Sequence, residues 1–101
     1  MLLGIDFSPG EITFNDLDLD LERPLLDQID ILKEDLLQVN YEGNYIIDVG
    51  WYPEFSKEGS FKIQVIKDFD WINPELLVDA ESITRLLEGV RMSISFIKEK
   101  L

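Results

Sequence analysis

The last twenty residues carry apolar side chains at helical spacing, and this pattern constrains the possible folds more than any other part of the sequence. One face of such a helix would hold Ile83, Leu86, Leu87, Val90, Ile94, Ile97 and Leu101. A stripe of this kind has to be buried against another layer. Asp79 is predicted to be the N-cap, with Glu81 in the positive first turn and Lys98 and Lys100 at the negative end. The sequence therefore predicts a long amphipathic C-terminal helix.

The centre of the chain changes to the two-residue period that is typical of strands. The predicted strands span residues 36–41, 45–52 and 61–68. A turn at 42–44 pairs the first two as a hairpin, and the turn-rich segment 53–60 leads into the third. Residues 76–78 form either a short edge strand or a continuation of the loop, because Pro74 cannot lie in a central strand. This order predicts an antiparallel meander.

The first third of the chain is predicted to hold two further extended segments and a short helix. Residues 2–7 and 12–21 are the extended segments, and the turn signal at 8–10 separates them. Pro24 suits the first position of a helix, which is predicted to span 24–34. These elements would precede the meander in the chain.

Leucine and aspartate alternate within the second extended segment. On a strand the two kinds of side chain point to opposite faces. The leucines, predicted to face the core, are Leu17, Leu19 and Leu21. The acids, predicted to face water or a positively charged partner, are Asp16, Asp18 and Asp20. A calcium-binding loop is disfavoured because Leu21 stands where such a loop requires glycine.

Together these segments predict an α+β fold. It consists of an antiparallel β-meander sheet, a short helix in the N-terminal half, and a long C-terminal amphipathic helix packed on the sheet. Residues 1–101 are expected to form a single acidic domain. No apolar run approaches the length of about 18 residues that a membrane span needs, and the start of the chain lacks a leader pattern. A cytoplasmic protein without membrane contact is expected.

The net charge of -12 is concentrated in the first half of the chain. Residues 1–50 carry 12 acidic side chains against Arg23 and Lys33, whereas residues 51–101 carry nine against seven basic ones. Such a field repels nucleic-acid phosphates and anionic membranes, and it speeds encounters with basic surfaces. Direct binding to nucleic acid is therefore disfavoured, and a basic protein partner is favoured.

Cysteine and histidine are both absent, which excludes disulfides and both Ser-His and Cys-His catalysis within the chain. Asp68 and Asp70 form an acid pair that could bind magnesium or act in acid–base catalysis, with Asp48, Glu54 and Glu58 as nearby candidates. No basic or glycine-rich phosphate-binding segment accompanies them. A polar loop is the preferred interpretation, and no enzymatic activity, metal or cofactor is predicted.

Three aromatic residues are candidates for a binding surface. Trp51 and Tyr52 end one predicted strand, and Trp71 follows the next. Exposed aromatics surrounded by acids suit a partner that carries Arg and Lys, because they combine burial with cation–π contact. One of Trp51 and Tyr52 must face inward, since neighbours on a strand point to opposite faces. Trp51, Tyr52 and Trp71 could equally be ordinary residues at the edge of the core.

Residues 45–74, YIIDVGWYPEFSKEGSFKIQVIKDFDWINP, together with the amphipathic helix that follows, resemble small immunity proteins encoded beside polymorphic bacterial toxins. These include the immunity proteins of contact-dependent growth inhibition systems. The matching features are the strand end at 50–53, the turn that contains Gly59, and the segment from Lys67 to Pro74. The resemblance implies a cytoplasmic antidote that binds a cognate toxin domain, frequently a nuclease, and occludes its active or substrate-binding surface.

The predicted function is therefore inhibition of a basic toxin by a monomer in a 1:1 complex. The predicted partner-binding residues are Asp16, Asp18 and Asp20 for electrostatic steering, and Trp51, Tyr52, Asp68, Asp70 and Trp71 as anchors. Two alternatives remain open. One is an acidic secretion chaperone or adaptor, which would be expected to dimerise, and the other is a carboxylate-based enzyme that uses a divalent metal.

Overall fold

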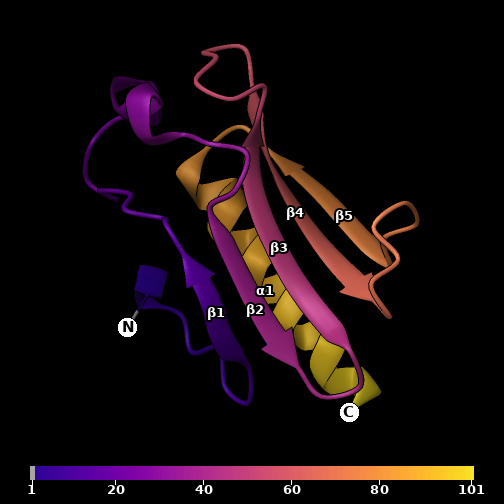
Figure 1. Cartoon of the computed structure of the whole chain (residues 1–101). Helices are drawn as coiled ribbons and strands as arrows, with labels where there is room; N and C mark the ends of the chain where they lie inside the picture. Colours follow the sequence, from indigo (N-terminus) through magenta and orange to yellow (C-terminus); the bar gives the residue numbers. More distant parts are fainter. Residues whose placement is uncertain (1) are drawn as a thin grey trace.

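Five strands follow one another in chain order across one antiparallel sheet, and a C-terminal helix packs on it (Figure 1). The computed structural model describes residues 2–101. The strands are β1 (Glu11–Asn15), β2 (Leu37–Tyr41), β3 (Tyr45–Tyr52), β4 (Ser60–Lys67) and β5 (Leu76–Ala80). The helix is α1 (Ile83–Lys100), and two 3-10 segments precede β2, η1 (Leu2–Gly4) and η2 (Leu25–Ile31). The predicted α+β meander is confirmed.

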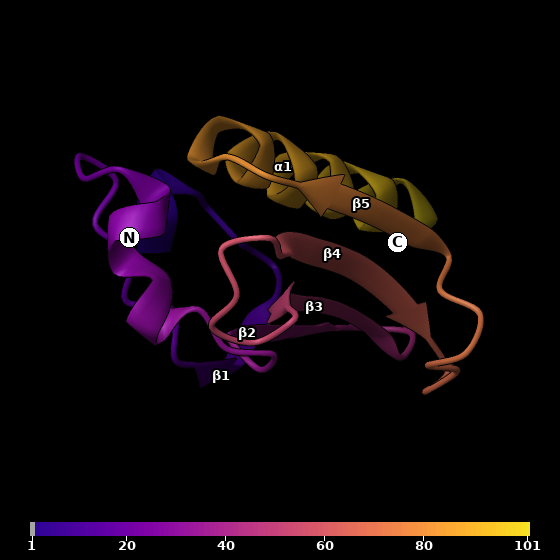
Figure 2. The same cartoon turned by 90° about the horizontal axis from the view of Figure 1, so that it is seen from above.

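α1 covers one face of the sheet (Figure 2). Its buried side chains pack with those of β3 and β4 that point toward it, including Val49 and Trp51 of β3 and Ile63 of β4. Gly89 lies close to the sheet, because a Cβ there would stand 3.1 Å from side-chain atoms of both Ile63 and Val78. The apolar stripe predicted for this helix is thus the side that closes the core.

The opposite side of the sheet is called the open face below. None of the elements described in residues 2–101 covers it as α1 covers the other side. Register and strand alternation place on it Gln38 and Asn40 of β2, Ile46, Asp48, Gly50 and Tyr52 of β3, Lys62, Gln64 and Ile66 of β4, and Leu77 and Asp79 of β5. Most of these side chains are polar.

The start of α1 differs from the prediction. Ser82 is the N-cap, and its hydroxyl accepts a hydrogen bond of 3.1 Å from the backbone N–H of Arg85. Asp79, the predicted cap, belongs instead to β5 and forms an ion pair with Lys62. The edge strand was the correct alternative for this segment. It continues to Ala80 because that side chain is buried opposite Phe61, which leaves Ser82 as the first position free to cap.

The first predicted strand is absent, and the second is shorter than predicted. Residues 2–7 form η1 and an irregular segment, although Leu3, Ile5 and Phe7 are buried. The hydroxyl of Tyr41 donates a hydrogen bond to the Phe7 carbonyl. The strand predicted over 12–21 ends at Asn15, whose side-chain oxygen accepts from the backbone N–H of Leu17. This local hydrogen bond bends the chain away from β2.

The predicted helix over 24–34 is present only as η2, and it lies at one end of the sheet (Figure 2). Gln28 interrupts it with a non-helical backbone. Its buried side-chain amide bonds both the N–H and the C=O of Asp20, each at 2.8 Å. The Gln28 amide has to point inward to satisfy the backbone N–H and C=O of Asp20. This requirement interrupts the helix, so a regular α-helix does not form here.

A bulge before β2 shapes one end of the open face. The backbone N–H of Trp51 donates to the Lys33 carbonyl, and that of Leu36 donates to the Val49 carbonyl. Glu34 and Asp35 lie between these two attachment points and pass over Gly50. A Cβ at Gly50 would collide with the Glu34 carbonyl oxygen, so this close approach requires glycine.

Replacing Gly50 by Ala is expected to lower the free energy of unfolding by about 2 kcal/mol, because the methyl group meets rigid backbone. Gly89→Ala is the matched control. There the methyl group meets the ends of side chains, and the gain in helix propensity of about 1 kcal/mol offsets the crowding. Urea denaturation of the three proteins measures both effects. Equal losses in the two variants would contradict the close approach at Gly50.

Candidate functional site

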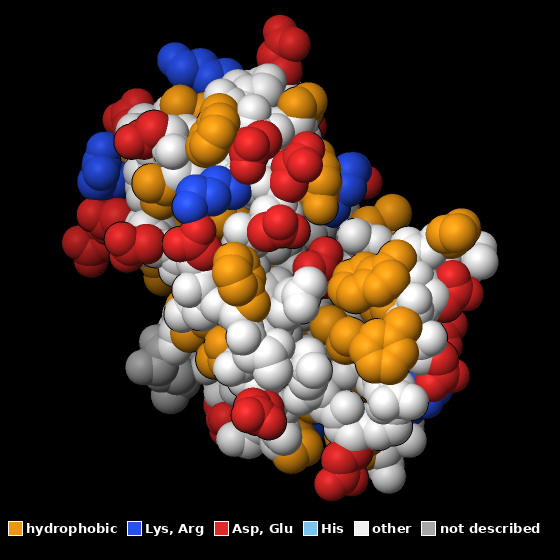
Figure 3. Space-filling model, viewed as in Figure 1, with side chains coloured by type: hydrophobic (Ala, Val, Ile, Leu, Met, Phe, Trp, Pro, Cys, Tyr) orange, Lys and Arg blue, Asp and Glu red, His pale blue; other side chains and the backbone are white. Residues whose placement is uncertain are grey.

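The open face carries polar and hydrophobic side chains, and among its strand residues Asp48 and Asp79 are acidic and Lys62 is basic. Figure 3 shows it from the side seen in Figure 1, with few basic groups among the acids and a hydrophobic patch over the lower halves of β3 and β4. Ile46 and Ile66 lie opposite each other on this face and are buried even though α1 is on the other side. The face therefore combines shielded apolar surface with negative charge.

Asp48 is the most buried acid of the structure described here, with 6% of its surface exposed. The side-chain amide of Gln38 donates to one of its oxygens at 3.2 Å. Burial raises the pKa of the Asp48 carboxyl, Asp35 raises the pKa further, and the hydrogen bond from Gln38 opposes the shift. None of the ion pairs formed within residues 2–101 includes Asp48.

A cavity of about 250 Å³ opens beside this carboxylate. Phe14, Asp35, Leu36, Gln38 and Asp48 line it, and it is called the Asp48 pocket below. The bulge over Gly50 brings Asp35 to its rim. The pocket thus combines an aromatic wall, an aliphatic wall and two carboxylates.

Tyr52, a predicted anchor, lies near the same end of the open face and is partly buried. Burial raises the pKa of its hydroxyl, and the negative charges of Asp48, Asp35 and Glu34 raise it further. The phenol therefore stays protonated at neutral pH and can donate a hydrogen bond. Tyr52 remains a candidate contact residue.

Trp51 is not available as a surface anchor, which corrects the prediction for this residue. Only 1% of it is exposed. Its indole N–H donates to the Ser56 carbonyl at 2.8 Å, and its ring meets that of Phe61 edge to face at 4.9 Å. The expectation that one of Trp51 and Tyr52 faces inward is confirmed, and the inward residue is Trp51.

The loop between β4 and β5 exposes three large apolar side chains. Phe69, Trp71 and Ile72, called the hydrophobic corner below, are 62%, 45% and 87% exposed. Figure 2 shows this loop curving away from α1, on the open side of the sheet. The predicted anchor Trp71 therefore lies on the surface together with Asp68 and Asp70.

A tight turn fixes the hydrophobic corner. Asp68 and Phe69 both have positive φ, at 53° and 61°, and the N–H of Asp70 donates to the Lys67 carbonyl at 3.1 Å. This is a type I′ turn with Phe where Gly is favoured. The Asp70 carboxylate accepts from the backbone N–H of Asn73 and so holds the rest of the loop.

Asp16, Asp18 and Asp20 do not form a row on one strand face, because β1 ends before them. Asp16 pairs with Lys33, and Asp20 accepts from the backbone N–H of Glu22 at 3.0 Å. Asp18 is exposed. These residues follow β1, at the edge of the sheet opposite the hydrophobic corner. The alternation did predict the burial of Leu17, whereas Leu19 is only partly buried and Leu21 is exposed.

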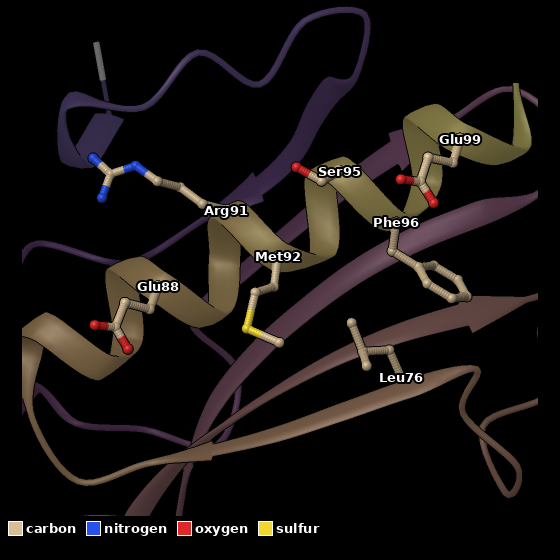
Figure 4. A pocket seen from close by; sticks show the side chains of 7 residues that line it. All are labelled: Leu76, Glu88, Arg91, Met92, Ser95, Phe96 and Glu99. Atoms are coloured by element: carbon tan, nitrogen blue, oxygen red, sulfur yellow. The ribbon is translucent and has the colours of Figure 1, made fainter.

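A wider groove of about 650 Å³ lies on the other side of the molecule, between α1 and β5. Figure 4 shows Met92 and Phe96 of α1 facing Leu76 of β5 across it. Glu88, Arg91, Ser95 and Glu99 complete its lining, so its charges are mixed. It offers apolar contact flanked by two glutamates and one arginine.

Among residues 2–101, no three acidic side chains are grouped in a way that could hold a metal ion. None of the helices in this part of the chain combines the length and apolar character that a membrane-spanning helix requires.

The sequence pattern does not indicate the pocket residues Asp35, Gln38 and Phe14 as binding residues. It indicates Asp48 only as a neighbour of the acid pair Asp68 and Asp70. The signal that could have identified it is the strand YIIDVGWY, in which one carboxylate stands among apolar side chains of a central strand. Gln38 lies opposite Asp48 on β2, whereas Phe14 comes from β1 and Asp35 from the bulge, which no periodicity marks.

Replacing Asp48 by Asn is expected to stabilise the free protein at pH 7. Because the folded-state pKa of Asp48 is raised above 3.8, the folded protein binds more protons than the unfolded chain between the two values, and stability falls as pH rises through that window. Asn keeps an acceptor for Gln38 and cannot ionise. Urea unfolding between about pH 3 and pH 7 should show the advantage of Asp48→Asn growing with pH. A variant less stable than the parent at pH 7 would contradict the strain assigned to this carboxylate.

Comparison of the chain with protein-family models, with curated proteins and with solved structures gave no match. No relative therefore supplies a function or a binding residue. Function has to be inferred from the chemistry of the surfaces described above, and the open face carries the most distinctive chemistry.

Proposed function

We propose that this protein is an immunity protein that neutralises a basic toxin domain by covering its active or substrate-binding surface with the open face. The observation that carries the proposal is the position of the hydrophobic corner on the open side of the sheet in a protein with a net charge of -12. Aromatic anchors surrounded by negative charge suit a partner whose own surface is apolar and basic.

The charge fits a nuclease as the partner class. A nuclease presents Lys and Arg to phosphates, and an acidic protein can occupy that surface in place of the phosphates. The acids of the first half of the chain, Asp18 among them, extend the negative field beyond the contact itself. Such a field accelerates association, and the acceleration weakens as salt is added. The resemblance of residues 45–74 to immunity proteins points in the same direction.

A secretion chaperone or adaptor is the second candidate. The groove between α1 and β5 favours it, because an apolar floor adjoins an edge strand and both suit a second copy of the chain. Sedimentation equilibrium separates the two proposals. A stable dimer without the partner would favour the adaptor, and a monomer would favour the immunity protein.

Co-expression tests the immunity proposal directly. The chain is produced with the product of the reading frame beside it in its own genome, and the complex is purified at moderate and at high salt. We expect the neighbour to stop growth when expressed alone, this chain to restore growth, and the two to purify in a 1:1 complex. A harmless neighbour that does not bind would refute the proposal.

Phe69→Gly is expected to separate stability from binding. Glycine relieves the left-handed backbone and should raise the free energy of unfolding by about 1 kcal/mol. Loss of the exposed ring should weaken the toxin complex by at least tenfold, as for an aromatic anchor. Calorimetric titration and urea unfolding measure the two effects.

Phe55→Gly is the matched control for this experiment. Phe55 is also exposed and also has a positive φ, of 60°, but it lies in the loop between β3 and β4. Its replacement should stabilise the fold to a similar extent and leave toxin affinity within about twofold. If both variants bind as tightly as the parent, the hydrophobic corner is not the contact surface.

A further inference from the structure

We propose that the Asp48 pocket receives the guanidinium group of one arginine of the partner protein, and that this arginine is the anchor at the acidic end of the open face. The inference deepens the proposed function and rests on it for the identity of the partner.

The carboxylate has no cation within the part of the chain that the structure describes. A buried acid is ordinarily paired, because removing its charge from water is costly. Lys62, the lysine of β4 that shares the open face, pairs with Asp79. Lys33, beside the bulge, pairs with Asp16. Asp48 is thus left as a buried acceptor that faces a cavity.

The pocket walls fit a guanidinium group better than an ammonium group. Phe14 is partly exposed and provides an aromatic wall, on which a planar guanidinium can stack. Asp48 and Asp35 provide carboxylates for its fork of N–H donors. Gln38 donates to one oxygen of Asp48 and thereby orients the carboxylate. An ammonium group would gain the charge interaction without the stacking.

The size of the cavity suits one side chain. At about 250 Å³ it lies below the range of roughly 300–1,000 Å³ that is typical of sites for whole small molecules. A divalent cation is a poor occupant, because residues 2–101 bring no three acidic side chains together to hold one. A side chain carried by a protein partner fits both observations.

The backbone is arranged to hold the second carboxylate at this position. The hydrogen bonds from Trp51 to Lys33 and from Leu36 to Val49 fix both ends of the bulge, and Asp35 within it lines the pocket together with Asp48. Only glycine at position 50 allows the bulge to cross the sheet there. Bulges recur beside functional sites because they redirect a side chain in this way.

Burial also raises the pKa of Asp48, so its ionised form is disfavoured in the free protein. A guanidinium group that enters the pocket removes this penalty by pairing with the charge. The Asp48 carboxylate therefore destabilises the free protein, whereas in the complex it makes a specific contact with the partner.

The test uses the free protein labelled with 15N and N-acetyl-arginine-N-methylamide as the probe. We expect saturable NMR shifts confined to the amide signals of residues that line the pocket, among them Gln38 and Asp48. Asp48→Asn should weaken binding of the probe at least tenfold. Because this variant keeps an acceptor for Gln38 and is expected to be more stable than the parent, such a loss cannot be assigned to unfolding.

Glu99→Gln is the control for the lost charge. Glu99 is exposed on α1, which covers the other side of the sheet, so its replacement should leave probe affinity within about twofold. Shifts spread over the acidic surface, or equal affinity in Asp48→Asn, would overturn the proposal. Equal or tighter binding of the corresponding lysine amide would overturn the choice of arginine.

The same two variants distinguish this inference from the proposed function. With a purified toxin, Asp48→Asn should weaken the complex by roughly thirtyfold or more, and Glu99→Gln by less than about twofold. A pocket that binds the arginine probe while the neighbouring protein proves harmless would refute immunity and leave the pocket assigned. A toxin complex that Asp48→Asn does not weaken would refute the pocket and leave immunity in place.

Discussion

The burial of α1 against one face of the sheet is the interaction on which the rest of the structure depends. One helix covers one face of a five-stranded sheet, and its apolar stripe packs with β3, β4 and β5. The other face, which no helix covers, must therefore carry polar side chains or be covered by a partner. The positions of the candidate binding groups on β3 follow from this asymmetry, because strand alternation sends Trp51 toward the helix and Asp48 and Tyr52 away from it.

The sequence predicted the regular elements well, since their burial follows a simple period. β3 matches its predicted bounds of 45–52, and α1 buries most of its predicted stripe. The N-terminal half was predicted poorly because two polar side chains capture backbone groups there. Asn15 ends β1 early, and Gln28 holds the preceding loop and interrupts η2. Such side-chain to backbone hydrogen bonds compete with secondary structure and leave no periodic trace.

Only part of the candidate site was predictable from the sequence. Asp68, Asp70 and Trp71 stand in an irregular stretch of the sequence, and irregular stretches usually lie on the surface. Trp51 was ambiguous between core and surface, and only its position on the inward side of β3 resolves this. The Asp48 pocket could not be derived, because it needs Phe14, the bulge at 33–36 and β3 to meet in space.

Two costs to the stability of the free protein lie along the proposed contact surface. Phe69 occupies a left-handed backbone position, and the burial of Asp48 disfavours its charge. Neither feature strengthens the core that α1 and the sheet form. A partner that buries the Phe69 ring would remove its exposure to water. A cation of the partner that pairs with the Asp48 carboxylate would remove the penalty on its buried charge. Since a ligand stabilises the state that it binds, the complex would be more resistant to unfolding than the free protein, and the gain would depend on the same groups that give specificity.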